Sequence, residues 1–252
     1  MSKSGRPNVP SSVRFQTQMP LDDGHLGSMK RPATDPKKLW RYNSTPMFDK
    51  NHESYEAWFD SHSTAYISEL LALRPFVPLD GLGLEIGVGS GRFAAPLGVR
   101  VGIDPSRKML EYAAARGVET LTAKAENLPF EDDTFDYALI VTTICFVDSP
   151  SEMLSEAGRV IKPGGHAVVG FIDRESPLGQ EYLKHKEESV FYRDATFYST
   201  SEVETLLKEN GFEVSSRAQT LTGLLPEIEA IEPTKSGSGE SAFIVIAATN
   251  KK

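Results

Sequence analysis

The sequence predicts a single doubly wound α/β domain with a helical cap on its N-terminal side. Beyond residue 80, short apolar runs alternate with helical segments of about ten residues, the pattern of right-handed βαβ crossovers in a parallel sheet. A glycine-rich loop joins the first of these runs to the helical segment that follows it. Near the end of the chain, two strands follow one another without a helix between them. They are therefore expected to pair antiparallel at one edge of the sheet.

The strands are predicted at 82–86, 100–103, 119–123, 135–141 and 166–171, with the late pair at 212–221 and 242–248. Helices are predicted at about 92–97, 106–116 and 151–161. Ser149 with Glu152, and Ser199 with Glu202, have the spacing of a capping box, in which each side chain accepts a backbone amide at the start of a helix. Gly211 suits the left-handed position that ends the helix after Ser199.

The N-terminal region has a different character. Aromatic and aliphatic side chains recur every three or four residues over 53–73, which predicts one helix that Pro75 and Pro78 bring to an end. Residues 1–37 hold five prolines and little apolar periodicity, so they are expected to form a disordered or loosely ordered tail. The folded domain is expected at 38–252, with the cap at 38–78 and an insertion at 174–198 over the site.

Composition narrows the class of protein. The 252 residues include 35 acids and 27 bases, and the net charge of −8 disfavours a nucleic-acid partner. The longest near-apolar run, from Ala138 to Val147, has half the length of a membrane span. The N-terminus lacks the apolar stretch of a signal peptide, and one cysteine allows no internal disulfide and suggests no metal site. A cytoplasmic protein is expected.

The glycine loop is the most informative segment. It reads LEIGVGSGRF over 84–93, and Arg92 stands where a dinucleotide-binding loop has its third glycine. Glu85 precedes the loop, and its carboxylate suits a ligand with a cationic amino group and would repel a pyrophosphate. Asp104 lies 19 residues later at the end of the next strand, where its two acceptor oxygens can take both hydroxyls of a ribose.

Together with VGIDPS (101–106), AENLPF (125–130), DDTFDYALIV (132–141) and EAGRVIKPGG (156–165), this loop resembles the class I S-adenosylmethionine-dependent methyltransferases, particularly the small "type 11" group. The resemblance implies a Rossmann-like, mostly parallel sheet of seven strands with an antiparallel last strand. It also implies S-adenosylmethionine as cofactor and S-adenosylhomocysteine as product. The implied cofactor-binding residues are Glu85, Gly87, Val88, Gly89, Gly91, Asp104, Pro105, Ala125, Glu126 and Thr142.

Within that resemblance, the three loop glycines are expected to pack on the methionine part of the cofactor, with Glu85 near its amino group, Asp104 on its ribose and the 125–130 loop along its adenine. Two departures from the family pattern stand out. Lys124 replaces an acid that many relatives use for the adenine amino group, and the crossover between Gly91 and Asp104 is about one helical turn short. Because of these departures, an alternative function remains: a catalytically inactive cofactor-binding protein that acts as a partner or sensor. A nicotinamide-dependent oxidoreductase is disfavoured by Glu85 and Arg92.

The methyl acceptor is expected at the end of the strand 135–141, because ligands of open parallel sheets bind at the carboxyl ends of the strands. Methyl transfer is an in-line displacement that mainly requires alignment and exclusion of water, so no fixed catalytic residue is predicted. The acceptor-site candidates are Tyr42, Tyr55, Trp58, Thr143 and Tyr192. Cys145 is expected to be a small packed residue rather than a nucleophile. The cap and the insertion are expected to form a closed, partly aromatic pocket, which favours a small organic acceptor. A protein acceptor is the alternative.

Overall fold

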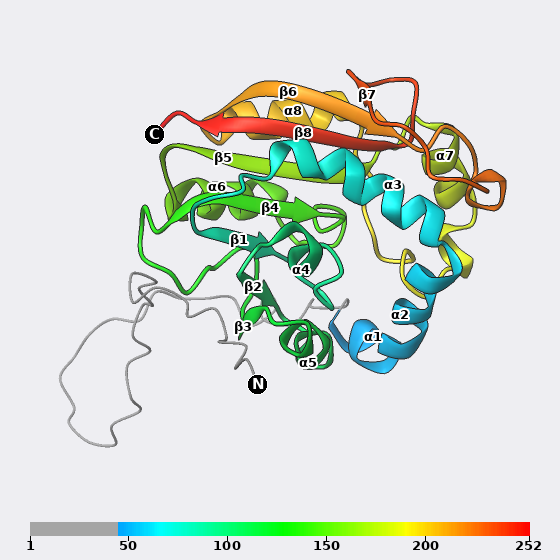
Figure 1. Ribbon diagram of the computed structural model, residues 1–252, viewed down its shortest axis with the longest axis horizontal. Helices are drawn as coiled ribbons and strands as arrows, with labels where there is room; N and C mark the ends of the chain where they lie inside the picture. Colours follow the sequence, from blue (N-terminus) through cyan, green and yellow to red (C-terminus); the bar gives the residue numbers. More distant parts are fainter. Residues whose placement is uncertain (1–44) are drawn as a thin grey trace, which may run out of the picture.

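The computed structural model describes residues 45–252, which form a central mixed sheet with helices on both faces (Figure 1). Eight strands follow the order β3-β2-β1-β4-β5-β8-β6-β7. Their bounds are β1 Gly83–Ile86, β2 Val101–Asp104, β3 Glu119–Thr122, β4 Phe135–Val141, β5 Ile161–Ile172, β6 Phe212–Thr220, β7 Lys235–Ser236 and β8 Phe243–Asn250. The predicted tail at 1–37, and the predicted start of the cap at 38–44, lie outside the described residues.

The pairing of the strands confirms the predicted sheet. The first five strands run parallel, and β8 is antiparallel to both of its neighbours, β5 and β6. The late strands pair as an antiparallel hairpin, as predicted. One strand was not predicted: the two-residue β7, which pairs with the end of β6 through Gln219 and Lys235 and adds an eighth member at the edge.

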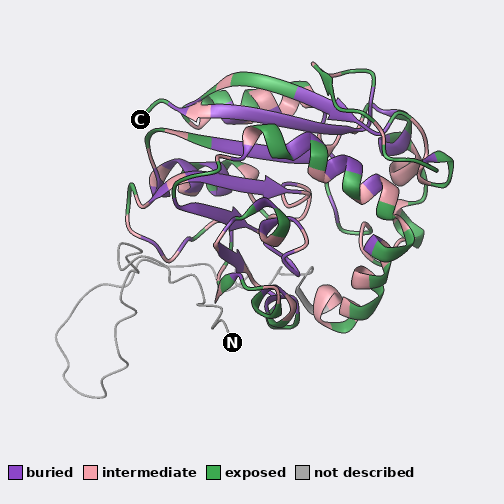
Figure 2. Ribbon diagram, viewed as in Figure 1, coloured by how far each residue is buried: buried purple, intermediate pink, exposed green. Residues whose placement is uncertain are grey.

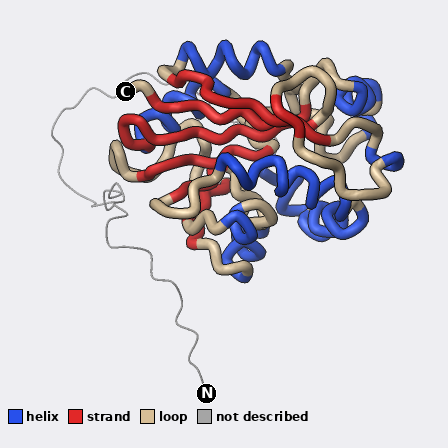
Figure 3. Tube along the Cα trace, turned by 45° about the horizontal axis from the view of Figure 1, so that its top comes forward, coloured by secondary structure: helices blue, strands red, loops and turns tan. Residues whose placement is uncertain are grey.

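The helices form two layers, one on each face of the sheet (Figures 1 and 3). Their bounds are α1 Thr45–Lys50, α2 His52–Ser61, α3 Ser63–Leu73, α4 Ala94–Leu97, α5 Arg107–Ala115, α6 Pro150–Val160, α7 Pro177–Lys184 and α8 Thr200–Glu209, with 3-10 turns at Arg74–Phe76, Lys186–Glu188 and Leu225–Glu227. Apolar residues of α6 and α8 cover one face. Those of α3, α4, α5 and α7 cover the other.

Strand β4 shows why the sheet needs both layers. Its Ala138 and Ile140 belong to the core beneath α6 and α8, whereas Leu139 and Val141 belong to the opposite core. All four side chains are buried. A strand covered on both faces is apolar throughout, which explains the unbroken run that the sequence shows here and the buried centre of the sheet in Figure 2.

The prediction of one helix over 53–73 is wrong in one respect, because the helix is interrupted at His62. The backbone of His62 leaves the helical region (φ −119°, ψ 41°) and separates α2 from α3. The Ser61 hydroxyl donates to the carbonyl oxygens of Ala57 and Trp58, each 3.0 Å away. Hydroxyl side chains that compete for backbone groups in this way weaken a helix. The break lets α3 lie along the sheet while α1 and α2 turn over the carboxyl ends of its strands (Figure 1).

The two predicted helix starts differ in detail. Ser199 and Glu202 form the complete capping box. At Ser149, the hydroxyl accepts the Glu152 amide as predicted, but the return bond comes from elsewhere: Glu126 accepts the Ser149 amide at 3.4 Å. No helix within 45–252 is long and apolar enough to cross a membrane.

Candidate active site

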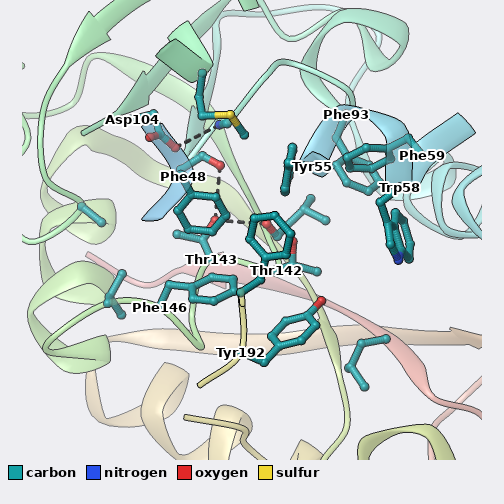
Figure 4. A pocket seen from close by; sticks show the side chains of 18 of the residues that line it. Phe48, Tyr55, Trp58, Phe59, Phe93, Asp104, Thr142, Thr143, Phe146 and Tyr192 are labelled. Atoms are coloured by element: carbon teal, nitrogen blue, oxygen red, sulfur yellow. Dashed lines mark hydrogen bonds between the residues drawn. The ribbon is translucent and has the colours of Figure 1, made fainter. Parts of the chain in front are cut away.

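A cavity lies at the carboxyl ends of β1, β2 and β4, where the strand order reverses between β1 and β4 (Figure 4). This is the position at which open α/β sheets bind their ligands. The cavity is lined by the glycine loop, the ends of the strands, the cap and the insertion. The lining residues include Phe48, Tyr55, Trp58, Phe59, Glu69, Gly87, Gly89, Asp104, Pro105, Ala125, Glu126, Thr142, Thr143, Phe146, Tyr182, Phe191 and Tyr192.

The glycine loop closes one end of the cavity, and its backbone at two positions favours glycine. Gly87 has φ +75°, and a Cβ there would collide with the side chain of Thr143. Gly89 has φ +50°, and a Cβ there would lie 3.4 Å from the Tyr55 hydroxyl. Both positions therefore need glycine, and the loop exposes its backbone to whatever occupies this end of the cavity.

Asp104 fixes the loop to the end of β2. Its Oδ2 accepts the Gly89 amide at 3.0 Å and its Oδ1 accepts the Ser106 amide at 2.8 Å. Burial raises the pKa of Asp104 to about 6, and the nearby charge of Asp49 acts in the same direction. An ionised carboxylate has roughly four acceptor positions, so this one has capacity for two more donors.

Three residues of the predicted cofactor set are not in the cavity wall. Glu85 is 1% exposed in β1, where burial raises its pKa well above the usual range and its Oε2 has no hydrogen-bond partner within the described residues. Val88 is buried in the core on the face of the sheet that α3, α4, α5 and α7 cover. Gly91 approaches α5 closely, and a Cβ there would lie 3.0 Å from the Ala113 Cα. Their contacts with a cofactor stay predictions.

The loop after β3 is tied to the loop after β4. Glu126 accepts the Asp148 amide at 2.8 Å, and Lys124 forms an ion pair of 3.8 Å with the Asp148 side chain. Lys124 therefore serves a contact between loops at the position where many members of the resembled family have an acid. Glu126 and Ala125 line the cavity, as their predicted place along the adenine requires.

Arg92, at the position of a third glycine, holds the cap to the loop. Its guanidinium group forms ion pairs with Glu56 of α2 at 2.9 Å and with Asp60 at 3.2 Å. Arg116 binds the same Glu56 oxygen at 2.5 Å and donates to the Ser90 carbonyl at 2.7 Å. Arg92, which replaces the third glycine of a dinucleotide-binding loop, thus anchors α2 over the cavity.

Aromatic rings from three separate segments close the other end of the cavity. Phe48 of the cap meets Phe146, which follows β4, at a centroid distance of 5.3 Å, and stacks with Phe191 of the insertion at 5.7 Å. Tyr192 stacks with Phe146 at 5.9 Å and with Tyr182 at 4.9 Å. Figure 4 shows Phe48, Phe146 and Tyr192 around a common space. The predicted joint action of cap and insertion therefore has a structural basis.

Thr142 and Thr143 lie between the two ends. Thr142 has φ +48°, a strained conformation for a β-branched residue that is found mostly at functional sites. The Thr143 hydroxyl donates to backbone carbonyls, at 3.1 Å from the Ile86 oxygen and 3.0 Å from that of Val141. Burial raises the pKa of the Cys145 thiol to about 12, so it is not ionised at neutral pH.

Of the predicted acceptor-site residues, Tyr55, Trp58, Thr143 and Tyr192 line the cavity, and Tyr42 lies outside the described residues. Three further lining residues, Phe48, Phe146 and Tyr182, were not predicted, because they contact residues that are distant in sequence.

A family model described as a methyltransferase domain matches residues 84–169. The structure of an S-adenosylmethionine-dependent methyltransferase from Thermotoga maritima, titled a possible histamine N-methyltransferase, is 50% identical with a TM-score of 0.80, and the alignment covers 83% of this chain and 100% of that one. The chain belongs to the S-adenosylmethionine-dependent methyltransferases.

Further relatives extend the similarity. An uncharacterized protein of Methanocaldococcus jannaschii is 44% identical over 202 residues, which cover 80% of this chain and 98% of the relative. An uncharacterized protein of Mycobacterium tuberculosis is 40% identical over 207 residues, covering 79% and 72%. The match extends well beyond the glycine loop in each case.

Membership of the methyltransferase family implies S-adenosylmethionine, and the cavity fits it. Asp104 offers acceptors to ribose hydroxyls, and Gly89 leaves the space that a Cβ would fill. The charged lining residues among 45–252 are the acids Glu69, Asp104 and Glu126, with no lysine, arginine or histidine, which suits a cofactor that carries a sulfonium cation.

Glu69 is the most informative cavity residue that was not predicted from the sequence. It lies in the middle of α3, is 5% exposed and borders the cavity. Burial alone raises its pKa to about 8. A signal was present: Glu69 is four residues from Ala65 and Leu73, both buried, so an acid occupies the apolar face of this helix.

Proposed function

We propose that this methyltransferase transfers the methyl group of S-adenosylmethionine to a small organic molecule bound among the aromatic rings. The observation that supports this most strongly is the continuity of the cavity, from the glycine loop and Asp104 at one end to Phe48, Phe146 and Tyr192 at the other. A walled, apolar compartment suits a small molecule, whereas a nucleic acid would need an open basic groove.

The proposed roles follow from position. The backbone of Gly87 and Gly89 holds the methionine part, Asp104 accepts the ribose hydroxyls, and Ala125 with Glu126 lies along the adenine. S-adenosylmethionine supplies a methyl carbon already activated by a sulfonium. The protein aligns the acceptor with that carbon, and its aromatic walls exclude water.

The test has two stages. Calorimetric titration with S-adenosylhomocysteine is expected to show binding in the micromolar range. Incubation with labelled S-adenosylmethionine and a library of small organic molecules is then expected to yield a methylated product. Absence of cofactor binding contradicts the proposal.

Binding without turnover of any small molecule or protein would instead favour the second candidate, a cofactor-binding protein without catalysis that acts as a partner or sensor. The features behind that candidate are Lys124 and the short crossover helix α4, which has four residues. Lys124 is engaged with Asp148 and does not obstruct the cavity wall, which supports the enzyme.

A further inference from the structure

Glu69 is a buried acid whose side chain forms no hydrogen bond or ion pair within residues 45–252. Buried carboxylates are normally paired, because removing a charge from water without compensation is costly. The other acids at this site are engaged: Asp104 accepts two backbone amides and Glu126 accepts the Asp148 amide. Glu69 differs from them because neither of its carboxylate oxygens has a partner among the described residues.

Three tyrosines that line the same cavity, one from the cap and two from the insertion, are close enough to Glu69 for its charge to act on them. Its charge acts on Tyr55 of α2, on Tyr182 of α7 and on Tyr192 of the insertion. Burial raises the pKa of all three phenols, so they stay neutral at physiological pH. Among the described residues that line the cavity, no basic side chain is present to neutralise Glu69.

An acid in the wall of a cavity that is also lined by aromatic rings has the chemistry that recognises an organic cation. The carboxylate provides the counter-charge, and the rings attract the cation through their electron-rich faces. The other two acids of the cavity, Asp104 and Glu126, favour a cation at the same site. An acceptor that is itself an anion would find no basic side chain among the described lining residues to pair with.

We propose that Glu69 binds the nucleophilic nitrogen of the methyl acceptor and receives its proton, and that the acceptor is a primary or secondary amine with an apolar body. This inference rests on the proposed function and assigns its substrate class. The apolar body lies against the aromatic rings, and the nitrogen lies at the carboxylate of Glu69.

The proton balance is simple. An ammonium group has no lone pair, so one proton must pass from nitrogen to the Glu69 carboxylate, leaving a neutral amine and a carboxylic acid. The nitrogen lone pair then forms the bond to the methyl carbon, the sulfur–methyl bond breaks, and its electron pair stays on sulfur as the thioether of S-adenosylhomocysteine. The raised pKa of Glu69 brings the acid closer to an amine in proton affinity, which eases the first transfer.

The test measures binding of three aryl amines, benzylamine, phenethylamine and tryptamine, in the presence of S-adenosylhomocysteine. Each is compared with its alcohol and with an aryl carboxylate of similar size. The variants are Glu69→Gln, which keeps the shape, and Glu111→Gln, which removes an exposed acid of α5 as a matched control. Calorimetry in two buffers of different ionisation enthalpy counts the protons released.

At least one amine is expected to bind the wild type more tightly than its alcohol and carboxylate. Glu69→Gln should lower the affinity for that amine by tenfold or more and leave the affinity for the alcohol unchanged. Glu111→Gln should bind both as wild type does. Because free Glu69 is largely protonated at neutral pH, binding of the ammonium form should release close to one proton, and Glu69→Gln should abolish that release.

The proposal is overturned if no amine binds the wild type, if the alcohols or carboxylates bind more tightly, or if Glu69→Gln binds amines as well as wild type does. Titration with S-adenosylhomocysteine alone separates the two claims. If the cofactor binds and the amines do not, only the inference about Glu69 fails. If the cofactor does not bind, the proposed function fails, and amine titration without cofactor still decides the role of Glu69.

Discussion

At the scale of single residues, the cavity contains two acids with raised pKa values, and they differ in their hydrogen bonds. Asp104 is held by two backbone amides, whereas Glu69 has no partner among the described residues. The physical cause of the shift is burial in both cases. The two acids are expected to cause different pH dependences. Asp104 should affect cofactor binding, and Glu69 should affect the stability of the ligand-free protein.

Glu69 should make the free protein less stable as the pH rises. An unfolded glutamate ionises near pH 4.5 and folded Glu69 near 8, so between these values the folded state holds a proton that the unfolded state has lost. The free energy of unfolding therefore falls across this interval. Glu69→Gln should match wild type near pH 4.5 and exceed it by a few kcal/mol above about pH 8.

Denaturant unfolding of both proteins from about pH 4.5 to about 8.5 measures this difference, with Glu111→Gln as the control for loss of an exposed charge. Parallel curves for wild type and Glu69→Gln would show that the carboxylate is solvated in solution, and would remove the basis for its assignment.

Asp104 should make cofactor binding sensitive to acid. Its pKa of about 6 means that the carboxylate is protonated below that pH and loses acceptor capacity for the ribose hydroxyls. The affinity for S-adenosylhomocysteine is expected to fall by up to about tenfold per pH unit below 6. Asp104→Asn should bind more weakly at neutral pH and show a flatter profile. A wild-type affinity that is constant down to about pH 5 would contradict the role of this carboxylate.

At the scale of elements, the cap is held by charge. Glu56 of α2 binds both Arg92 and Arg116, and its side chain is 13% exposed. Asp49 at the end of α1 accepts the Ser106 hydroxyl at 2.6 Å, which fixes the cap to α5 as well. The first two helices of the described chain thus have polar anchors in addition to the packing of Phe59 in the core.

Glu56→Gln should therefore loosen the cap. We expect a loss of about 1–3 kcal/mol, because two guanidinium groups lose their shared charged partner. Faster amide hydrogen exchange over residues 45–61, with little change in the central strands, would locate the effect. The exposed pair of Lys108 and Glu111 offers the matched comparison, where Glu111→Gln should cost below about 0.5 kcal/mol. Equal costs for the two variants would argue against this anchor.

At the scale of the whole molecule, the proposed methyl transfer requires that the cap, the strand ends and the insertion meet around one cavity. Phe48 contacts rings from two of those segments as well as Tyr55 of its own. Phe48→Ala should raise the acceptor KM several-fold and leave the affinity for S-adenosylhomocysteine within about threefold, because the substitution opens the acceptor end and not the glycine loop. Leu79→Ala, at a side chain that is 89% exposed, is the control. An unchanged acceptor KM would contradict the closed compartment.

The sequence predicted the sheet and the glycine loop well, because strands buried on both faces and loops that exclude side chains leave local patterns. Asp104 was predicted from its spacing, 19 residues after Glu85 at the end of the next strand. The break at His62 was not, since helical periodicity continues across it. Phe48 and Phe146 become neighbours only through tertiary packing. Glu69 was missed because an acid on a helix usually faces water, and only its place on the apolar face marks it as different.

The most direct test of the account compares two glycine substitutions by calorimetric titration with S-adenosylhomocysteine. Gly89→Ala and Gly98→Ala both impose a left-handed alanine at a cost of about 1–2 kcal/mol. A methyl group at Gly89 points toward Tyr55, whereas none of the described atoms lies within 4 Å of one at Gly98. We predict that Gly98→Ala binds like wild type and that Gly89→Ala loses at least tenfold in affinity. Wild-type affinity in Gly89→Ala would contradict the placement of the cofactor at this loop.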